Sequence, residues 1–342
     1  MADVAEAAGV SRATASFVLN GRAEAIPVTT RQRVLDAADR LGYRSNRIAQ
    51  VLARRRTNLI GTCIPDVENP FFASLTAYLN HCVNRNGYRI IFEVTEYGAD
   101  GLSRRQAVEQ LLDWRVDGLV LYSSEVYPQP VHDLIANTPT VFIGTCAPEE
   151  DSDAVTLDNY AGARAVVEYL VALGHREICH LGPIGAMGGA RERASCDVCQ
   201  IAGLPPPLVM TCKADSPSDA RAVALAIAKS KRRVTAVVCH NDLLALGAIS
   251  GFRDAGLRVP DDISVTGYDD NWAAAYSEPP LTTVEFPYRS MVDTALDFLV
   301  RRMRGEEQNG PLHRILSPQL IVRGSTGQAP EYGEITGRHS RR

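Results

Sequence analysis

The sequence predicts a small all-α head followed by a larger α/β body of two parallel-sheet subdomains. The chain has 342 residues, 45% of them hydrophobic, which is enough to bury more than one core. Its first part contains short amphipathic helical patterns, whereas from residue 59 onward short β-rich runs alternate with amphipathic stretches. This alternation repeats after residue 158 and is typical of parallel strands joined by helical crossovers.

The two parts differ in charge. Residues 1–60 hold ten arginines and five acidic residues, while the remaining residues hold nine more acidic than basic side chains. A basic head on an acidic body indicates a polyanionic partner for the head alone. A solvated arginine surface would give the same composition, so charge by itself leaves both interpretations open.

The sequence carries no sign of secretion or of a membrane span. No run reaches the roughly 18 consecutive apolar residues that a span needs. No basic segment followed by an apolar one is visible at the N-terminus, so we expect a cytoplasmic protein without a membrane partner. The eight cysteines are then expected to be reduced. Cys196 and Cys199 form a CxxC pattern, but no second ligand pair accompanies them, so we predict no metal site and no cofactor.

The head begins with two short helices joined by a tight turn. In DVAEAAGV the apolar residues fall on one helical face, Gly9 ends the helix, and Ser11 is a suitable N-cap for the next helix, RATASFVL. We expect Val10, Ala15 and Val18 to pack inward. The outward face then comprises Arg12, Ala13, Ser16 and Phe17. This is the geometry of a helix-turn-helix, whose second helix places side chains in the DNA major groove.

A third helix and a basic, partly apolar segment follow. VTTRQRVLDAADRLGY has Thr29 or Thr30 as a cap and apolar residues at helical spacing, namely Val34, Leu35, Ala38 and Leu41. The segment RSNRIAQVLARRRTN combines five arginines with several apolar residues. It suits a hinge helix that orders on DNA, because arginines neutralise phosphates while an apolar side chain wedges between base steps of the minor groove.

The chain resembles the lactose/galactose repressor (LacI-type) family of bacterial transcription regulators. The resemblance is carried by DVAEAAGVSRATASFVLNG, by VTTRQRVLDAADRLGYRSNRIAQVLARRRTNLIG and by PDVENPFF. It implies a helix-turn-helix head, a hinge helix and a body similar to periplasmic sugar-binding proteins. The implied boundaries are 1–44 for the head, 45–58 for the hinge, 59–157 with 286–314 and 158–285 with 315–326 for two effector-binding subdomains, and 327–342 for a polar tail.

The resemblance also implies which residues contact DNA. Arg12 and Ala13 are the leading base-reading residues, and Leu52 is the minor-groove wedge. The full implied set is Ser11, Arg12, Ala13, Ser16, Phe17, Asn20, Arg47, Ala49, Leu52 and Arg54. Phe17 stands where many relatives have a base-contacting arginine, which predicts an unusual operator preference: Arg12 suits a guanine edge and Phe17 a thymine methyl group. A surface or packing role for Phe17 is the alternative.

The carboxyl ends of the predicted strands indicate a ligand site, because two consecutive α/β units bind ligands in the cleft between them. PDVENPFF follows the first strand and is expected to bring Asp66, Phe71 and Phe72 to this cleft. The aromatic faces can stack on a sugar or a base, although a core role for one phenylalanine is an alternative.

The second unit supplies polar groups at its strand ends. CHND presents Asn241 and Asp242, and GYDD presents Asp269 and Asp270. These side chains suit a hydroxyl-rich ligand; the alternative is that either aspartate caps the following helix. GARERAS offers Arg191 or Arg193, of which Arg191 is the better match to the family's ligand-binding arginine. The expected effector-binding residues are Asp66, Phe71, Phe72, Arg191, Asn241 and Asp269.

Two positions depart from the family pattern in the expected cleft. Relatives commonly have aspartate at the position of Gly144 and glutamine at the position of Phe286. The loss of two polar groups makes a simple monosaccharide a less secure prediction and leaves a more apolar or base-like ligand open. The residues specify neither the effector nor whether it acts as inducer or corepressor.

We therefore predict a repressor that is switched by a small polar effector, a sugar or related metabolite, and binds a palindromic operator as a homodimer. A solute-binding protein or an enzyme with a similar α/β body is the alternative. The first would have no use for the basic head. The second lacks a visible catalytic motif, since GPIGAMGG has no phosphate-loop lysine and no nucleophile motif lies beside His175 or His180.

Overall fold

The computed structural model describes residues 1–19, 23, 25–43, 56–95, 101–123, 129–144, 152–183, 189–213, 215–230, 232–307 and 309–331. The chain forms two compact units, Met1–Asn58 and Leu59–Arg342. They correspond to the all-α head and the α/β body, so the predicted fold class is confirmed. In the described ranges no helix is both long enough and apolar enough to cross a membrane.

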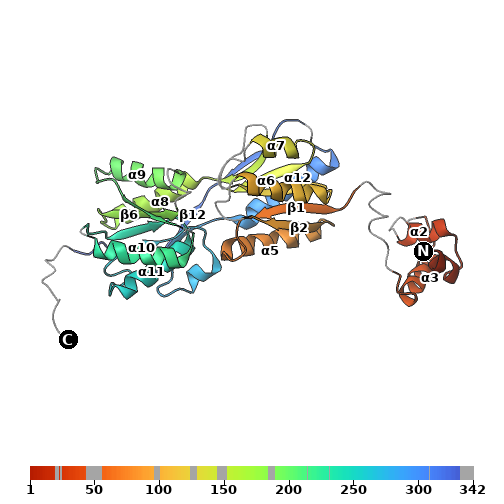
Figure 1. Ribbon diagram of the computed structural model, residues 1–342, viewed down its shortest axis with the longest axis horizontal. Coiled ribbons are helices and arrows are strands. Elements are labelled where there is room, and N and C mark those ends of the chain that lie inside the picture. The colour runs from red at the N-terminus through yellow and green to blue at the C-terminus, as the bar shows by residue number, and fades with distance from the viewer. Residues whose placement is uncertain are drawn as a thin grey trace. The chain divides into compact units, whose positions relative to one another are not determined.

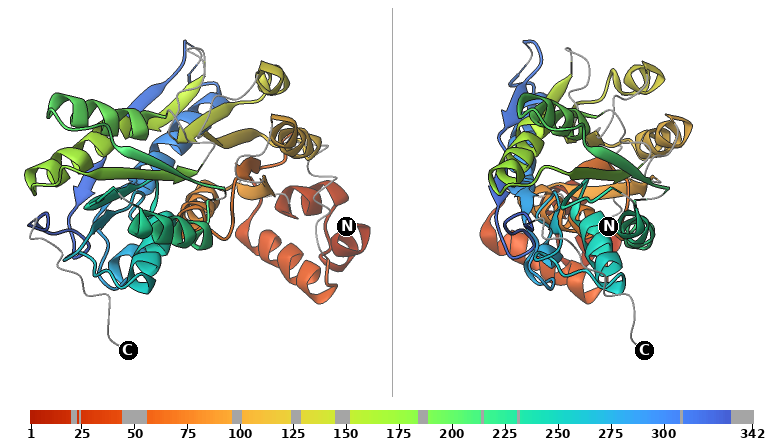
Figure 2. Two further views of the ribbon diagram at one scale, coloured as in Figure 1. Left: turned by 60° about the vertical axis from the view of Figure 1, so that its left-hand side comes forward. Right: turned by 90° about the vertical axis from the view of Figure 1, so that its left-hand side faces the viewer.

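The described residues of the head form three helices (Figures 1 and 2). They are α1 (Ala2–Ala7), α2 (Arg12–Leu19) and α3 (Val28–Arg40). The predicted turn is confirmed, because Gly9 has φ 63° and the Ser11 hydroxyl accepts a hydrogen bond from the Thr14 backbone N–H at 3.0 Å. Small side chains dominate the core and let the helices approach closely; it contains Val4, Ala5, Ala8, Ala15, Val18, Ala23, Val34, Ala37 and Ala38.

Helix α3 differs from its prediction at both the cap and the buried face. It begins at Val28 after Pro27, which has no side chain that can cap, so the predicted threonine cap is wrong. Proline at this point holds φ near the helical value and starts the helix earlier than expected. Leu35 and Leu41 are 44% and 51% exposed, because Ala37 takes the inward position.

The first body sheet has six parallel strands in the order β11-β5-β4-β3-β1-β2. Its strands are β1 (Leu59–Ile64), β2 (Arg89–Val94), β3 (Gly118–Ser123), β4 (Thr140–Gly144), β5 (Asp153–Leu157) and β11 (His313–Leu316). Helices α5 (Pro70–Arg85) and α12 (Tyr288–Arg304) cover one face, and α6 (Gly101–Asp113) and α7 (Gln129–Ile135) cover the other. The alternation along β3 shows this, since Val120 packs with the first helix pair while Leu119 and Leu121 pack with the second.

The second body sheet has four parallel strands in the order β7-β6-β8-β9. They are β6 (Ile178–Pro183), β7 (Leu208–Cys212), β8 (Ala236–Cys239) and β9 (Ser264–Thr266). Figure 1 shows α8 (Asn159–Ala172) and α9 (Ala190–Ile201) on one face, with α10 (Pro217–Lys229) and α11 (Asp242–Asp254) on the other.

The chain passes between the two sheets three times. It leaves the first sheet after β5, returns between β10 (Thr283–Glu285) and α12, and leaves again between β11 and β12 (Gln319–Ile321). Strands β10 and β12 pair with each other as a small antiparallel ribbon. The expected boundary at residue 314 falls inside β11, whose ladder with β5 continues to the pair Leu316↔Leu157.

Strands β5, β7 and β11 were not among the predicted strands. β7 and β11 are edge strands, and most of their side chains are partly or fully exposed, so they lack the buried apolar run that marks a central strand. β5 is fully buried but consists of only five residues. Tertiary pairing, rather than local pattern, places these three segments in the sheets.

Candidate functional sites

The outward face of α2 is the candidate nucleic-acid interface of the head. Arg12 and Ala13 are exposed, Ser16 is partly buried, and Phe17 is 49% exposed. Phe17 is not part of the core formed by the described residues of the head, so a packing role is excluded, while a plain surface role stays open beside a DNA contact. Val18 and Ala15 occupy the inward positions because helical spacing places them opposite Phe17.

Five of the predicted DNA-binding residues lie outside the described residues. They are Asn20, Arg47, Ala49, Leu52 and Arg54. A hinge helix is expected over 45–58; of this segment only residues 56–58 are described, so the hinge helix and its DNA contacts stay predictions.

The first sheet contributes an aromatic cluster at the start of α5. Phe71 packs against Phe286 with ring centroids 4.7 Å apart, and Phe72 packs against Tyr122 at 4.8 Å, both in edge-to-face geometry. Phe71 and Phe72 are each 3% exposed. The alternative of a core role, which was considered for only one phenylalanine, therefore applies to both. Asp66, on the turn before α5, is partly buried and accepts a hydrogen bond from the Glu68 backbone N–H at 2.7 Å.

The second sheet contributes a buried guanidinium. Arg191, in the first turn of α9, is 9% exposed, whereas Arg193 is exposed. Arg191 donates hydrogen bonds from Nε to Asn159 Oδ1 at 3.3 Å and from Nη1 to the His240 carbonyl oxygen. Its guanidinium also stacks 3.7 Å above the Tyr268 ring.

Asp269 lies just after strand β9 and faces the Arg191 guanidinium. Arg191 Nη2 lies 3.9 Å from Asp269 Oδ1, and both side chains are 10% exposed. Burial raises the pKa of Asp269 well above its ordinary value, and the guanidinium at this distance only partly opposes that effect. Asp269 also has φ 108°, a strained conformation for a residue with a side chain, and such strain concentrates at functional sites.

Asn241 links the start of α11 to a carboxylate that the sequence did not indicate. Its Oδ1 accepts a hydrogen bond from the Leu244 N–H at 2.9 Å, which caps the helix. Its Nδ2 donates to both carboxylate oxygens of Asp215 at 2.8 Å. Burial raises the pKa of Asp215, nearby Asp66 adds to the effect, and the bond from Asn241 opposes it. Asp215 follows β7, so recognising that strand would have indicated it.

The two neighbouring aspartates have structural partners instead. Asp242 is fully buried and accepts hydrogen bonds from the Thr283 hydroxyl at 2.5 Å and the Asn271 N–H at 2.8 Å. Burial raises the pKa of Asp242 to about 7. Asp270 forms an ion pair with Arg323 at 2.7 Å. The capping alternative for the aspartates is wrong, since Asn241 caps α11 and, in the described part of the chain, neither Asp242 nor Asp269 caps a helix through its side chain.

Direct contacts join the aromatic and polar groups into one site. Phe286, which packs on Phe71, donates its backbone N–H to the Asp269 carbonyl oxygen at 3.2 Å. Asp269 faces Arg191, which binds the backbone of the residue before Asn241. The structure therefore brings Phe71, Arg191, Asn241 and Asp269 together, with Phe72 beside Phe71.

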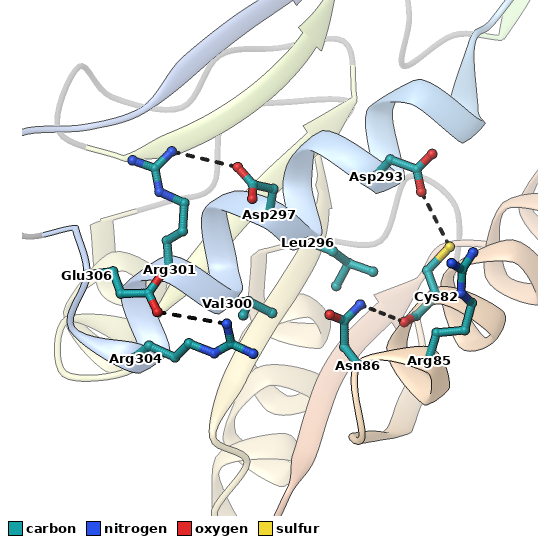
Figure 3. Close-up of a pocket in the computed structure, with 10 residues that line it drawn as sticks. All are labelled: Cys82, Arg85, Asn86, Asp293, Leu296, Asp297, Val300, Arg301, Arg304 and Glu306. Carbon is teal, nitrogen blue, oxygen red and sulfur yellow. Dashed lines mark hydrogen bonds and ion pairs between the residues drawn. The ribbon is translucent and has the colours of Figure 1, made fainter.

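A separate hollow of roughly 400 Å³ lies between α5 and α12 (Figure 3). It is lined by Cys82, Arg85, Asn86, Asp293, Leu296, Asp297, Val300, Arg301, Arg304 and Glu306. Opposite charges pair along its α12 side, as in Arg301 with Asp297 at 3.7 Å and Arg304 with Glu306 at 3.8 Å. It shares no residue with the Arg191 site, so we do not assign it a ligand.

Two family models match the chain, one described as "Bacterial regulatory proteins, lacI family" over residues 1–46 and one as "Periplasmic binding protein-like domain" over residues 167–326. The HTH-type transcriptional regulator MalR of Streptomyces coelicolor is 34% identical, over 96% of this chain and 97% of its own. The solved structure of the Lac repressor dimer bound to operator and the anti-inducer ONPF is similar, with a TM-score of 0.83 and 28% identity, over 95% of this chain and 98% of that chain. The structure of the CelR–cellobiose complex has a TM-score of 0.68 and 27% identity, over 94% of this chain and 98% of that chain. These relatives are regulators of transcription, not enzymes.

Proposed function

Since the chain belongs to the lacI family of bacterial regulatory proteins, we propose that it is a repressor that binds a palindromic operator as a dimer and responds to a small polar effector. The observation that carries this proposal is the exposed face of α2, where Arg12, Ala13 and Phe17 project from a small, well-packed three-helix core. A rigid helix with an arginine in its first turn suits the major groove. Arg12 reads a guanine edge, and Phe17 contacts a thymine methyl group.

The effector binds at the Arg191 site. Arg191, Asn241 and Asp269 bind its polar groups, while Phe71 and Phe72 form the apolar side. Because the site draws residues from both body sheets, a bound effector changes the preferred angle between them. Moving the protein almost completely from one state to the other requires a preference of about 5.5 kcal/mol. The segment 45–58 passes this change to DNA, with Leu52 inserted in the minor groove and Arg47, Ala49 and Arg54 beside it.

Dimerisation uses the exposed edge of the first sheet. β2 is an edge strand, and its Phe92 and Val94 side chains are 47% and 53% exposed. A long apolar edge is normally covered by a partner. A second copy of this chain is the occupant that also satisfies a two-fold symmetric operator, and the similar Lac repressor structure is a dimer on its operator.

The test is to sequence the DNA fragments that the full-length protein protects in its own genome, and then to measure affinity for the best site by fluorescence anisotropy. We expect a palindromic site and an affinity that is about 5- to 150-fold weaker for Arg12→Ala, since a bidentate base contact contributes about 1–3 kcal/mol. Arg105→Ala removes the same charge from an exposed helical ion pair of the body and should leave affinity unchanged. Equal affinities of the Arg12 variant and wild type would refute the role of α2.

A further inference from the structure

Tyr268 lies between the Arg191 site and a place where the chain passes from one sheet to the other. Its side chain is 2% exposed, and the Arg191 guanidinium lies over one face of its ring, 3.7 Å from the centroid. Its hydroxyl oxygen abuts Gly162 in α8, because a Cβ atom at Gly162 would overlap that oxygen. The same Cβ would lie 2.9 Å from Pro318 Cγ, in the segment that joins β11 to β12. One aromatic ring therefore spans from the proposed effector site to the crossing.

The backbone of Tyr268 is held on both sides. Its carbonyl oxygen accepts a hydrogen bond from the Asp242 N–H at 2.8 Å, at the start of α11. The N–H of the next residue, Asp269, donates to the Val284 carbonyl oxygen at 2.8 Å, in β10. Because the backbone is fixed and the surroundings are close-packed, a displacement of the Arg191 guanidinium falls on the Tyr268 ring and on what its hydroxyl touches.

Both ends of this contact have unused hydrogen-bonding capacity. The Tyr268 hydroxyl is buried without a hydrogen-bond partner among the residues that the structure describes. Buried polar atoms in native proteins almost always have a partner, and one that lacks it raises the free energy of the arrangement it is in. Arg191 Nη2 lies 3.9 Å from Asp269 Oδ1, which is beyond hydrogen-bond distance, so its N–H groups remain available to a ligand. The present arrangement thus leaves a second one open, in which these groups are paired.

We propose that Tyr268 is the positioning residue that couples the effector site to the crossing between β11 and β12. A ligand that accepts hydrogen bonds from Arg191 Nη2 draws the guanidinium across the ring, and the ring then moves against Gly162 and Pro318. In the second arrangement the Tyr268 hydroxyl gains a partner, so the two arrangements differ little in free energy and a ligand can select between them. This inference rests on the proposed function, because it concerns how the proposed effector site acts on the angle between the sheets.

The test needs no ligand, because substitutions can change both sides of the contact. Tyr268→Phe removes the unpartnered hydroxyl and therefore favours the present arrangement. Gly162→Ala places a Cβ atom where the hydroxyl lies and therefore disfavours it. Fluorescence anisotropy of the full-length protein on its best genomic site should show operator affinities that change in opposite directions, each by at least about threefold. The double variant should lie between the two single variants.

Two matched controls separate this coupling from general effects of such substitutions. Tyr169→Phe removes a hydroxyl group of α8 that pairs with Thr326 at 3.2 Å, and Gly327→Ala adds a Cβ atom whose nearest neighbours are at an ordinary 3.5 Å. Neither control should change operator affinity by as much as about twofold. Urea denaturation shows which variants fold. If Gly162→Ala does not fold, the comparison of Tyr268→Phe with Tyr169→Phe decides the question.

Arg191→Lys tests the other end of the contact, since it keeps the charge and loses the planar group that lies on the ring. The effect of Tyr268→Phe on operator affinity should be clearly smaller in this background, because the two residues act through one contact. The inference is overturned if Tyr268→Phe leaves operator affinity within twofold of wild type, if Gly162→Ala shifts it in the same direction, or if the two backgrounds give equal effects. With wild-type operator binding intact, such a result removes only the coupling through Tyr268; if wild type binds no operator, the proposed function itself fails.

Discussion

The first body sheet supplies the aromatic side of the proposed effector site, and the second sheet supplies its charged side. On the aromatic side, Phe71, Phe72 and Phe286 are 2–3% exposed and pack edge to face, so they are part of a core. On the charged side, Arg191 and Asp269 are almost as deeply buried, but the free energy of burying each side chain depends on the charge of the other. The difference teaches that one side tolerates changes of shape poorly and the other tolerates changes of charge poorly.

The largest expected effect follows from removing the buried guanidinium. Arg191→Ala should lower the free energy of unfolding by about 4 kcal/mol, because it removes the hydrogen bonds of the guanidinium to Asn159 and the His240 carbonyl oxygen and its stacking on Tyr268. Arg193→Ala, two residues along the same helix and exposed, should change it by less than about 0.5 kcal/mol. Urea denaturation of both variants measures the difference. If the two variants are equally stable, the charged side does not depend on Arg191.

The second prediction concerns pH and only the charged side. Burial raises the pKa of Asp242 from its ordinary 3.8 to about 7, so the folded state binds this proton more tightly than the unfolded state. The contribution of Asp242 to stability is therefore fully present below about pH 4 and is lost as pH rises to about 7, by about 3 kcal/mol. The lowering of the His180 pKa to about 4 acts in the opposite direction.

Comparison with Asp242→Asn isolates the effect, because the histidine contribution is the same in both proteins. We expect the stability of wild type, relative to this variant, to fall between pH 4 and pH 7. Denaturant unfolding at several pH values measures it. A difference between the two proteins that stays constant across this range would contradict the assignment.

The smallest effect is expected on the aromatic side. Phe71→Leu should cost about 2 kcal/mol through lost contacts and a small cavity. A double-mutant cycle with Phe286→Leu should give a coupling of about 1 kcal/mol, since the rings are 4.7 Å apart in edge-to-face geometry. The cost should be the same at pH 4 and pH 7, unlike that of Asp242→Asn. A coupling near zero would show that the two rings are independent.

Much of the fold could be predicted because it depends on local pattern. The helices of the head and the central strands β1, β3, β6 and β8 are marked by their own residues, through helical spacing or short apolar runs. The edge strands β7 and β11 could not be predicted in this way, because their exposed side chains carry no such pattern. The missed strand β7 is also the reason that Asp215 was missed.

The sequence by itself determined the architecture and indicated most residues of the proposed effector site, including Arg191, Asn241 and Asp269, because motifs and strand ends are local features. Only the tertiary structure decided how these residues are partnered. In the folded chain Arg191 contacts Asn159, the His240 backbone and Asp269, and Asn241 donates a hydrogen bond to Asp215. Those partners are separated by tens of residues along the chain, and only the packing of helices on the two sheets brings their charges within a few ångströms.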